Sequence, residues 1–90
     1  MLKHLNVKIA GKVQGVSFRA STKQMADLLG VDGFVRNESD GAVYLEAEGE
    51  EESVFKLIHW CHHGPDNAVI EQVSVTEGEM KGYTGFEIRR

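Results

Sequence analysis

Residues 33–48 have the sequence GFVRNESDGAVYLEAE, in which two apolar stretches flank a turn signal. The dipeptide Asp40-Gly41 is a strong signal for a tight β-hairpin turn. After the turn, apolar Val43, Leu45 and Ala47 alternate with polar residues, as in a strand with one buried face. The segment therefore predicts a β-hairpin in the middle of the chain.

The sequence on each side of this hairpin predicts a helix and further strands. Core-facing residues three and four positions apart mark two helices. The stripe of the first helix consists of Phe18, Thr22, Met25, Ala26 and Leu29, and that of the second of Val54, Leu57, Ile58 and Cys61. Strands are predicted at 5–10, where apolar and polar residues alternate, at 69–75 and at 85–89.

The order of these elements is β-α-β-β-α-β with a short extra strand, which is the order of ferredoxin-like domains. It predicts an α+β fold, a two-layer sandwich in which both helices cover one face of a mostly antiparallel sheet. The other face is expected to be wet, because its strand positions are polar. At this length, residues 1–90 form a single domain around one core.

The composition limits the classes of function. The chain is 41% hydrophobic and 27% charged, with a formal net charge of −4, and this acidic balance argues against nucleic-acid binding. Cys61 is the only cysteine, so no internal disulfide can form and a reducing compartment is expected. No apolar run approaches the roughly 20 residues that a membrane span needs, and the N-terminus resembles no signal peptide. We expect a soluble cytoplasmic protein that binds no membrane.

The connection from the first strand to the first helix has the composition of an anion site. Residues 9–19 are IAGKVQGVSFR, and glycines there allow several N–H groups to turn toward one point. The helix N-terminus adds free N–H donors and a positive dipole, and Arg19 can bond two phosphoryl oxygens with its planar guanidinium. The alternative, a glycine-rich connection with a surface arginine, has about equal weight on physical grounds alone. A Walker A pattern is absent.

Asn37 ends the strand that precedes the hairpin turn. An asparagine in this position commonly caps a turn with its side chain. The functional alternative is a carboxamide that holds a water molecule in place.

Both segments resemble the acylphosphatase family. The loop matches the motif G-x-V-Q-G-V-x-F-R, and the hairpin segment matches G-F/Y-x-x-N-x-x-x-G-x-V, each at every fixed position. The resemblance covers nearly the whole chain, including residues 60–65 and 85–88. Ser17 stands where many members have glycine or an aromatic residue, and Ala20 where tyrosine is frequent.

The resemblance implies metal-independent hydrolysis of the carboxyl–phosphate bond of an acyl phosphate, giving a carboxylate and inorganic phosphate. It implies that Arg19 binds the phosphoryl group and that Asn37 orients the attacking water. The predicted phosphate-binding residues are Gln14, Gly15, Val16, Ser17, Phe18 and Arg19. No cofactor is implied, and the expected ligands are the acyl phosphate substrate and inorganic phosphate or a similar anion.

Local charge is expected to favour this anion despite the acidic balance of the chain, because salt screens fields beyond about 8 Å. Four cations lie in or near the two segments and predict a positive cleft; they are Lys12, Arg19, Lys23 and Arg36.

Other sites and functions have weaker support. His59 and His63 are spaced as some zinc ligands are, but surface histidines beside a buried Cys61 are the preferred interpretation, with His62 among them. An RNA-binding sheet would carry aromatic and basic residues on the strand after the hairpin turn, where the outward positions of this chain are Tyr44, Glu46 and Glu48. The serious alternative is a non-catalytic module that binds acyl phosphate or carbamoyl phosphate, because acylphosphatase-like domains also occur in larger hydrogenase-maturation carbamoyltransferases. Turnover distinguishes the two.

Overall fold

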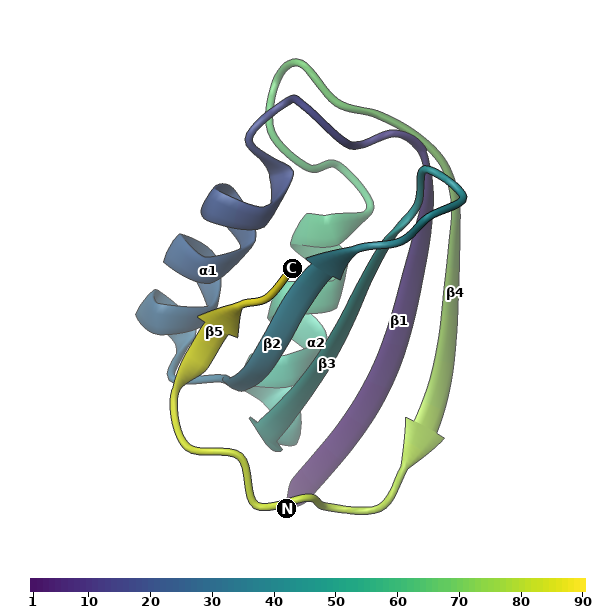
Figure 1. The fold of residues 1–90 in the computed structure, drawn as a ribbon. Helices are drawn as coiled ribbons and strands as arrows, with labels where there is room; N and C mark the ends of the chain where they lie inside the picture. Colours follow the sequence, from purple (N-terminus) through teal and green to yellow (C-terminus); the bar gives the residue numbers. More distant parts are fainter.

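Two helices and five strands form in the predicted order, and the computed structural model describes residues 1–90. The elements are β1 (Leu2–Lys12), α1 (Phe18–Leu29), β2 (Asp32–Asn37), β3 (Val43–Glu50), α2 (Glu51–Cys61), β4 (Val69–Gly78) and β5 (Phe86–Ile88). They make a two-layer sandwich (Figure 1), which confirms the ferredoxin-like fold class. No helix is long and apolar enough to cross a membrane.

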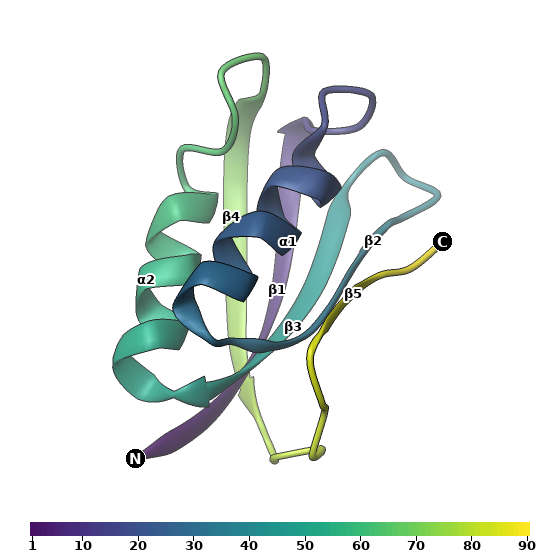
Figure 2. The same cartoon turned by 90° about the vertical axis from the view of Figure 1, so that its left-hand side faces the viewer.

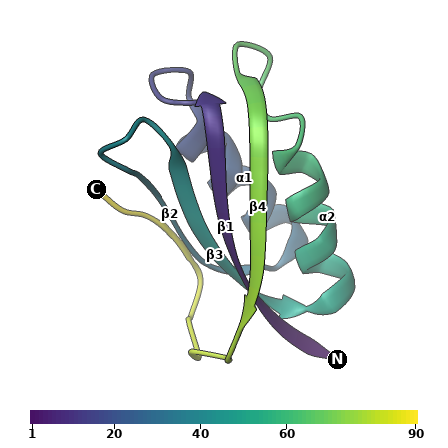
Figure 3. The same cartoon turned by 90° about the vertical axis from the view of Figure 1, so that its right-hand side faces the viewer.

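The sheet has the strand order β4-β1-β3-β2-β5. Its pairs β1–β3, β1–β4 and β2–β3 are antiparallel, and β5 adds to β2 in parallel. Views from opposite sides show both helices on one face of this sheet (Figures 2 and 3). Helix α1 packs against β2 and β5, whereas α2 packs against β1 and β3.

The core lies between the helices and the sheet, where the alternating strand residues meet the helix stripes. Its members include Val7, Ile9, Val43, Leu45, Phe18, Ala26, Val54, Leu57 and Cys61. Met25 and Leu29 are partly buried at its margin. Helix α1 stops at Gly30, whose positive φ of 71° turns the chain so that the N–H of Val31 bonds the carbonyl of Ala26 at 2.9 Å.

The opposite face of the sheet is drier than predicted. His4, Phe34 and Glu48 point to this face, yet only 1%, 2% and 2% of their surfaces are exposed. The reason is the segment between β4 and β5, which crosses at the end of the molecule that holds the N-terminus (Figure 1). It places Tyr83 against Phe34, with ring centroids 5.8 Å apart. The expectation of a wet face was therefore wrong at this end of the sheet.

Three strands and one helix bring their ends together at the other end of the sheet. β1 and β2 both run antiparallel to β3, and β5 runs parallel to β2. The carboxyl ends of β1, β2 and β5 therefore share one edge, and α1 begins there, so the 13–17 loop and the β2–β3 turn lie at the same end (Figure 2).

A β-bulge directs β1 into this loop. The register of β1 with β4 shifts between Ala10 and Gly11, and Gly11 has a φ of 134°. A Cβ at Gly11 would collide with the carbonyl oxygen of Val69, so glycine is required for the close approach of the two strands.

Candidate active site

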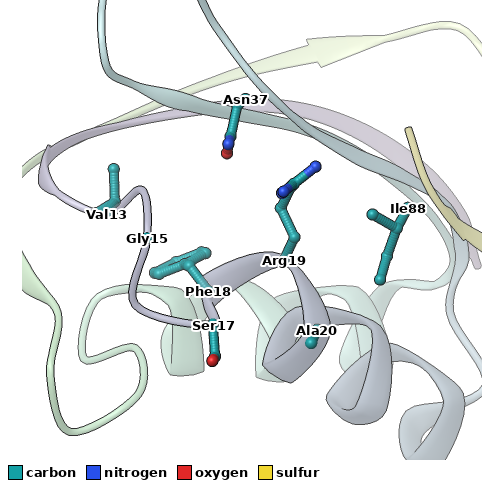
Figure 4. Close-up of a pocket in the computed structure, with 8 residues that line it drawn as sticks. All are labelled: Val13, Gly15, Ser17, Phe18, Arg19, Ala20, Asn37 and Ile88. Atoms are coloured by element: carbon teal, nitrogen blue, oxygen red, sulfur yellow. The ribbon is translucent and has the colours of Figure 1, made fainter. Parts of the chain in front are cut away.

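A half-open pocket of about 180 Å³ lies at the shared edge. Arg19, the second residue of α1, and Asn37, the last residue of β2, extend into the space between the two elements (Figure 4). The complete lining is Val13, Gly15, Ser17, Phe18, Arg19, Ala20, Asn37 and Ile88. The fold therefore brings together the two residues that the sequence singled out.

The loop before α1 has the conformation of an anion cradle. Gly15 has a φ of 74°, and Ser17, the N-cap of α1, has a φ of 63°. Left-handed residues of this kind turn successive N–H groups toward one side of the chain. The N–H groups of residues 13–20 donate to no acceptor within the protein, and Ser17 makes no side-chain cap bond. These donors, with the positive end of the helix dipole, are available to an anion.

Arg19 is held from the side by the end of the chain. Its Nη1 lies 3.4 Å from the carbonyl oxygen of Arg89, and the N–H of Arg89 donates to the carbonyl of Val35 at 2.8 Å. Residue 89 thereby continues the pairing of β5 with β2 and supports the guanidinium. A guanidinium has five N–H donors, so most of them remain for a ligand.

Asn37 carries the clearest sign of function. Its Oδ1 is buried and has no hydrogen-bond partner, and the side chain points toward the cradle (Figure 4). Leaving such an atom unpaired costs about 1–3 kcal/mol, and native structures contain few of them. The carboxamide does not cap the turn, so a polar partner in the pocket is its expected complement.

The remaining residues of the predicted phosphate site fall into two groups. Gly15, Ser17 and Phe18 line the pocket, but the Phe18 ring is buried 5.7 Å from that of Trp60, so the backbone is what this residue can offer an anion. Val16 packs against the core, and the side chain of Gln14 is bonded to the β2–β3 turn.

Three lining residues were not predicted, namely Val13, Ala20 and Ile88. Ile88 reaches the pocket because β5 pairs with β2 in parallel, and this pairing of distant segments leaves no local signal in the sequence. Val13 is a fixed residue of the loop motif and Ala20 directly follows that motif, and both give the pocket an apolar wall.

The predicted positive cleft is confined to Arg19, the one cation of the four that lines the pocket. Lys23 bonds Asp27 at 2.9 Å and the carbonyl of Phe86 at 3.1 Å. The Arg36 guanidinium lies 4.8 Å from the centre of the Tyr44 ring on the other face. The broader expectation was wrong because side-chain direction, rather than sequence position, decides which charges reach the pocket.

The histidine-rich end of α2 gathers no ligand set. Nowhere in the protein do three or more His, Cys, Asp or Glu side chains come together as a metal site requires. His59, His62 and His63 are exposed, whereas burial raises the pKa of the Cys61 thiol to about 12. A neutral, buried thiol is a core residue rather than a nucleophile.

Fold and site together define a small α+β domain with an anion-directed loop at the shared edge of its sheet. The acylphosphatase family model matches residues 5–88. The acylphosphatase of Rubrobacter xylanophilus is 48% identical over 88 residues, which cover 97% of this chain and 80% of that protein. The chain belongs to the acylphosphatase family.

Solved structures agree with this assignment. The acylphosphatase of Bacillus subtilis superposes with a TM-score of 0.95 at 32% identity, over 100% of both chains. Full-length HypF in its phosphate- and nucleotide-bound form superposes with a TM-score of 0.93 at 33% identity, over 100% of this chain and 12% of that one. The same domain therefore also occurs as a small part of a much longer protein.

Proposed function

We propose that this protein hydrolyses the carboxyl–phosphate bond of acyl phosphates to a carboxylate and inorganic phosphate, with Arg19 and Asn37 as its catalytic residues. The observation that carries the proposal is the buried, unpartnered Oδ1 of Asn37, opposite a cradle of free N–H groups. Membership of the acylphosphatase family supports the same activity.

The cradle and Arg19 share the work of holding the phosphoryl group. The free N–H groups of the loop and the first turn of α1 bond its oxygens, and the guanidinium of Arg19 bonds two of them through its fork. Phosphoryl transfer requires mainly positioning and charge stabilisation from the protein. Both are available here from the backbone and one arginine.

Asn37 places the attacking water. Its Oδ1 accepts a hydrogen bond from the water, which leaves an oxygen lone pair directed at phosphorus. A neutral carboxamide suffices if the transition state is loose, because the water then keeps its protons until late in the reaction.

The leaving group needs little help from the protein. The conjugate acid of a carboxylate has a pKa of about 4, so the carboxylate departs as an anion without a general acid. The pocket lining contains no His, Cys, Asp or Glu, which suits a reaction without acid–base residues. Alkyl phosphates, whose leaving alkoxides are far more basic, should react poorly.

The test is hydrolysis of benzoyl phosphate by the wild type and Asn37→Ala, with exposed Asn67→Ala as the matched control. We expect Asn37→Ala to lose about 10²–10³-fold in kcat, or about 3–4 kcal/mol, as when an oriented oxyanion donor is removed. Inorganic phosphate should inhibit all three proteins equally, and EDTA should leave the wild-type rate unchanged. Unchanged turnover with weakened phosphate binding would make Asn37 a binding residue, and a rate restored only by added metal would overturn the metal-free mechanism.

A second candidate is a binding module for acyl phosphate or carbamoyl phosphate, favoured by the similarity to a small part of HypF. Phosphate binding that depends on Arg19, without turnover of any acyl phosphate, would support this function instead. We further propose that the protein acts as a cytoplasmic monomer, since one chain supplies every site residue and a single buried cysteine suits a reducing compartment.

A further inference from the structure

Gln14 joins the two halves of the site. Its Nε2 donates to the carbonyl of Glu38 at 2.8 Å and to that of Ala42 at 3.0 Å. These carbonyls lie at the two ends of the β2–β3 turn, and Glu38 directly follows Asn37. In the loop, Gln14 directly precedes Gly15, so one side chain ties the cradle to the turn beside Asn37.

The turn closes without Gln14. The N–H of Glu38 donates to the carbonyl of Ala42 at 2.8 Å, and that of Gly41 to the carbonyl of Glu38 at 3.2 Å. The N–H of Ala42 adds a bond to Oδ1 of Asp40 at 3.0 Å. The shape of the turn is therefore fixed locally, and the pairing of β1 with β3 up to Ile9 and Val43 places its base. The bonds from Gln14 add the direct ties between the turn and the cradle.

No other hydrogen bond joins residues 13–17 to residues 38–42. The turn has a further anchor in the ion pair between Lys8 and Asp40 at 2.7 Å, but both side chains are about half exposed, and such pairs contribute little. The side-chain oxygen of Asn37 has no partner of its own. Its placement against the cradle consequently depends on the backbone that carries it.

We propose that Gln14 is a positioning residue for hydrolysis, which acts through Asn37 and does not bind the phosphoryl group. The proposal rests on the proposed function. A displacement of about 1 Å between reacting groups can cost about 10²-fold in rate, so a loosened turn lowers turnover while the cradle still binds phosphate. This differs from the role that the family resemblance suggested for Gln14, since its amide is already engaged by two carbonyls.

The test compares Gln14→Met, which keeps the length of the side chain and removes both donors, with exposed Gln72→Met as the control. Gln14→Met should lower kcat about 10–100-fold and leave the Kd for inorganic phosphate within about twofold. In an Asn37→Ala background, the same change should alter the residual kcat by less than about twofold, because the residue through which it acts is gone.

Other outcomes overturn the proposal. Unchanged kcat would show that the hydrogen bonds from Gln14 to the turn have no part in the reaction. A phosphate Kd raised tenfold would place Gln14 in the anion site. Additive losses in the double variant would mean that Gln14 acts by a route other than Asn37. If Gln14→Met does not fold, Gln14→Asn serves in its place, since its shorter side chain cannot reach both carbonyls.

One readout is independent of turnover. The ¹H–¹⁵N resonances of the Asn37 side-chain amide should shift or broaden in Gln14→Met and stay unchanged in Gln72→Met. A wild type that hydrolyses no acyl phosphate would overturn the proposed function. An unperturbed Asn37 amide in Gln14→Met would instead overturn the positioning role of Gln14.

Discussion

Polar side chains of the strands are buried on both faces of the sheet, but they have hydrogen-bond partners on only one of them. On the helix-covered side, the buried Oδ1 of Asn37 has no partner. The N–H groups of residues 13–20, which include the exposed Gly15, Ser17 and Ala20, donate to no acceptor within the protein. On the other side, the carboxylate of Glu48 accepts a bond from Nδ1 of His4 at 2.7 Å and from the N–H groups of Lys81 at 2.8 Å and Tyr83 at 2.7 Å.

The second region, which we call the Glu48 cluster, also includes Glu46 and Tyr44. Both Tyr44 and Tyr83 donate their hydroxyl hydrogens to Glu46, at 2.7 and 2.8 Å. Burial and the bond to Glu46 raise the pKa of Tyr44 to about 12. Burial is the largest influence on Glu48 and would raise its pKa, but the bonds from Lys81, His4 and Tyr83 together outweigh it and hold the pKa below its ordinary value.

The difference separates stability from function. A satisfied buried carboxylate stabilises the fold through the segment that it binds, whereas an unsatisfied one or an orphan amide lowers stability until a ligand arrives. Substitutions in the active site should therefore reduce activity and spare folding, and substitutions in the Glu48 cluster should do the reverse.

The largest effect is expected at Arg19. Arg19→Ala should lower kcat/KM about 10³–10⁵-fold, the range for loss of an arginine that stabilises phosphoryl transfer, and should abolish phosphate binding. Arg19→Lys should fail nearly as badly because a point charge cannot replace the fork. The measurement is kcat/KM with benzoyl phosphate. The control is Lys56→Ala, which removes an exposed positive charge on α2. Wild-type rates in either Arg19 variant would remove it from the mechanism.

Glu48→Gln should affect stability and little else. A carboxamide keeps one acceptor oxygen and places an NH2 donor where the second oxygen was. Either the Tyr83 N–H or both His4 and the Lys81 N–H therefore lose their acceptor. Breaking a buried pair in this way should reduce the free energy of unfolding by about 2–4 kcal/mol, measured by urea denaturation against exposed Glu71→Gln. A kcat reduced more than about threefold in the folded variant would show that the two regions are not separate.

Acidic pH should weaken the Glu48 cluster, whereas neutral pH should leave it intact. The folded-state pKa values of Glu46 and Glu48 lie below the ordinary value of 4.5, so their contribution is complete above that pH. It is lost as the pH falls through the lower folded-state values. Urea denaturation between pH about 3 and about 7 should show this loss, and Glu48→Gln should flatten it. An equal slope in the variant would assign the acid sensitivity to other groups.

The smallest effect is expected from Ser17→Gly, a substitution in the active-site loop. Ser17 has a left-handed conformation without a cap bond, and such a conformation costs a non-glycine residue about 1–2 kcal/mol. Ser17→Gly should raise the free energy of unfolding by about 0.5–1 kcal/mol, with kcat within about threefold of wild type. A loss of stability would mean that the serine side chain contributes to the folded state.

Much of the fold was predictable because its determinants are local. Alternation around Leu45, the Asp40-Gly41 turn and the stripe through Leu57 gave the element order, and each is a pattern of neighbouring residues. The burial of His4 and Glu48 was not predictable, since polar residues at outward strand positions look solvated until a distant segment covers them.

The candidate site also has a part that could be predicted from local sequence and a part that could not. Arg19 and Asn37 were predicted from motifs, and the structure places them in one pocket. The wall at Ile88, the carbonyl of Arg89 behind Arg19 and the bonds of Gln14 depend on pairings between segments far apart in the chain. Spacing along the sequence carries no information about these contacts.

The parallel pairing of β5 with β2 has a kinetic consequence. The pocket needs the loop after β1, the end of β2 and the last strand of the sheet, so no partly assembled sheet contains a complete site. Topologies built from such non-local contacts fold slowly compared with helical bundles. During refolding from denaturant, catalytic activity should therefore return only when β5 has paired with β2.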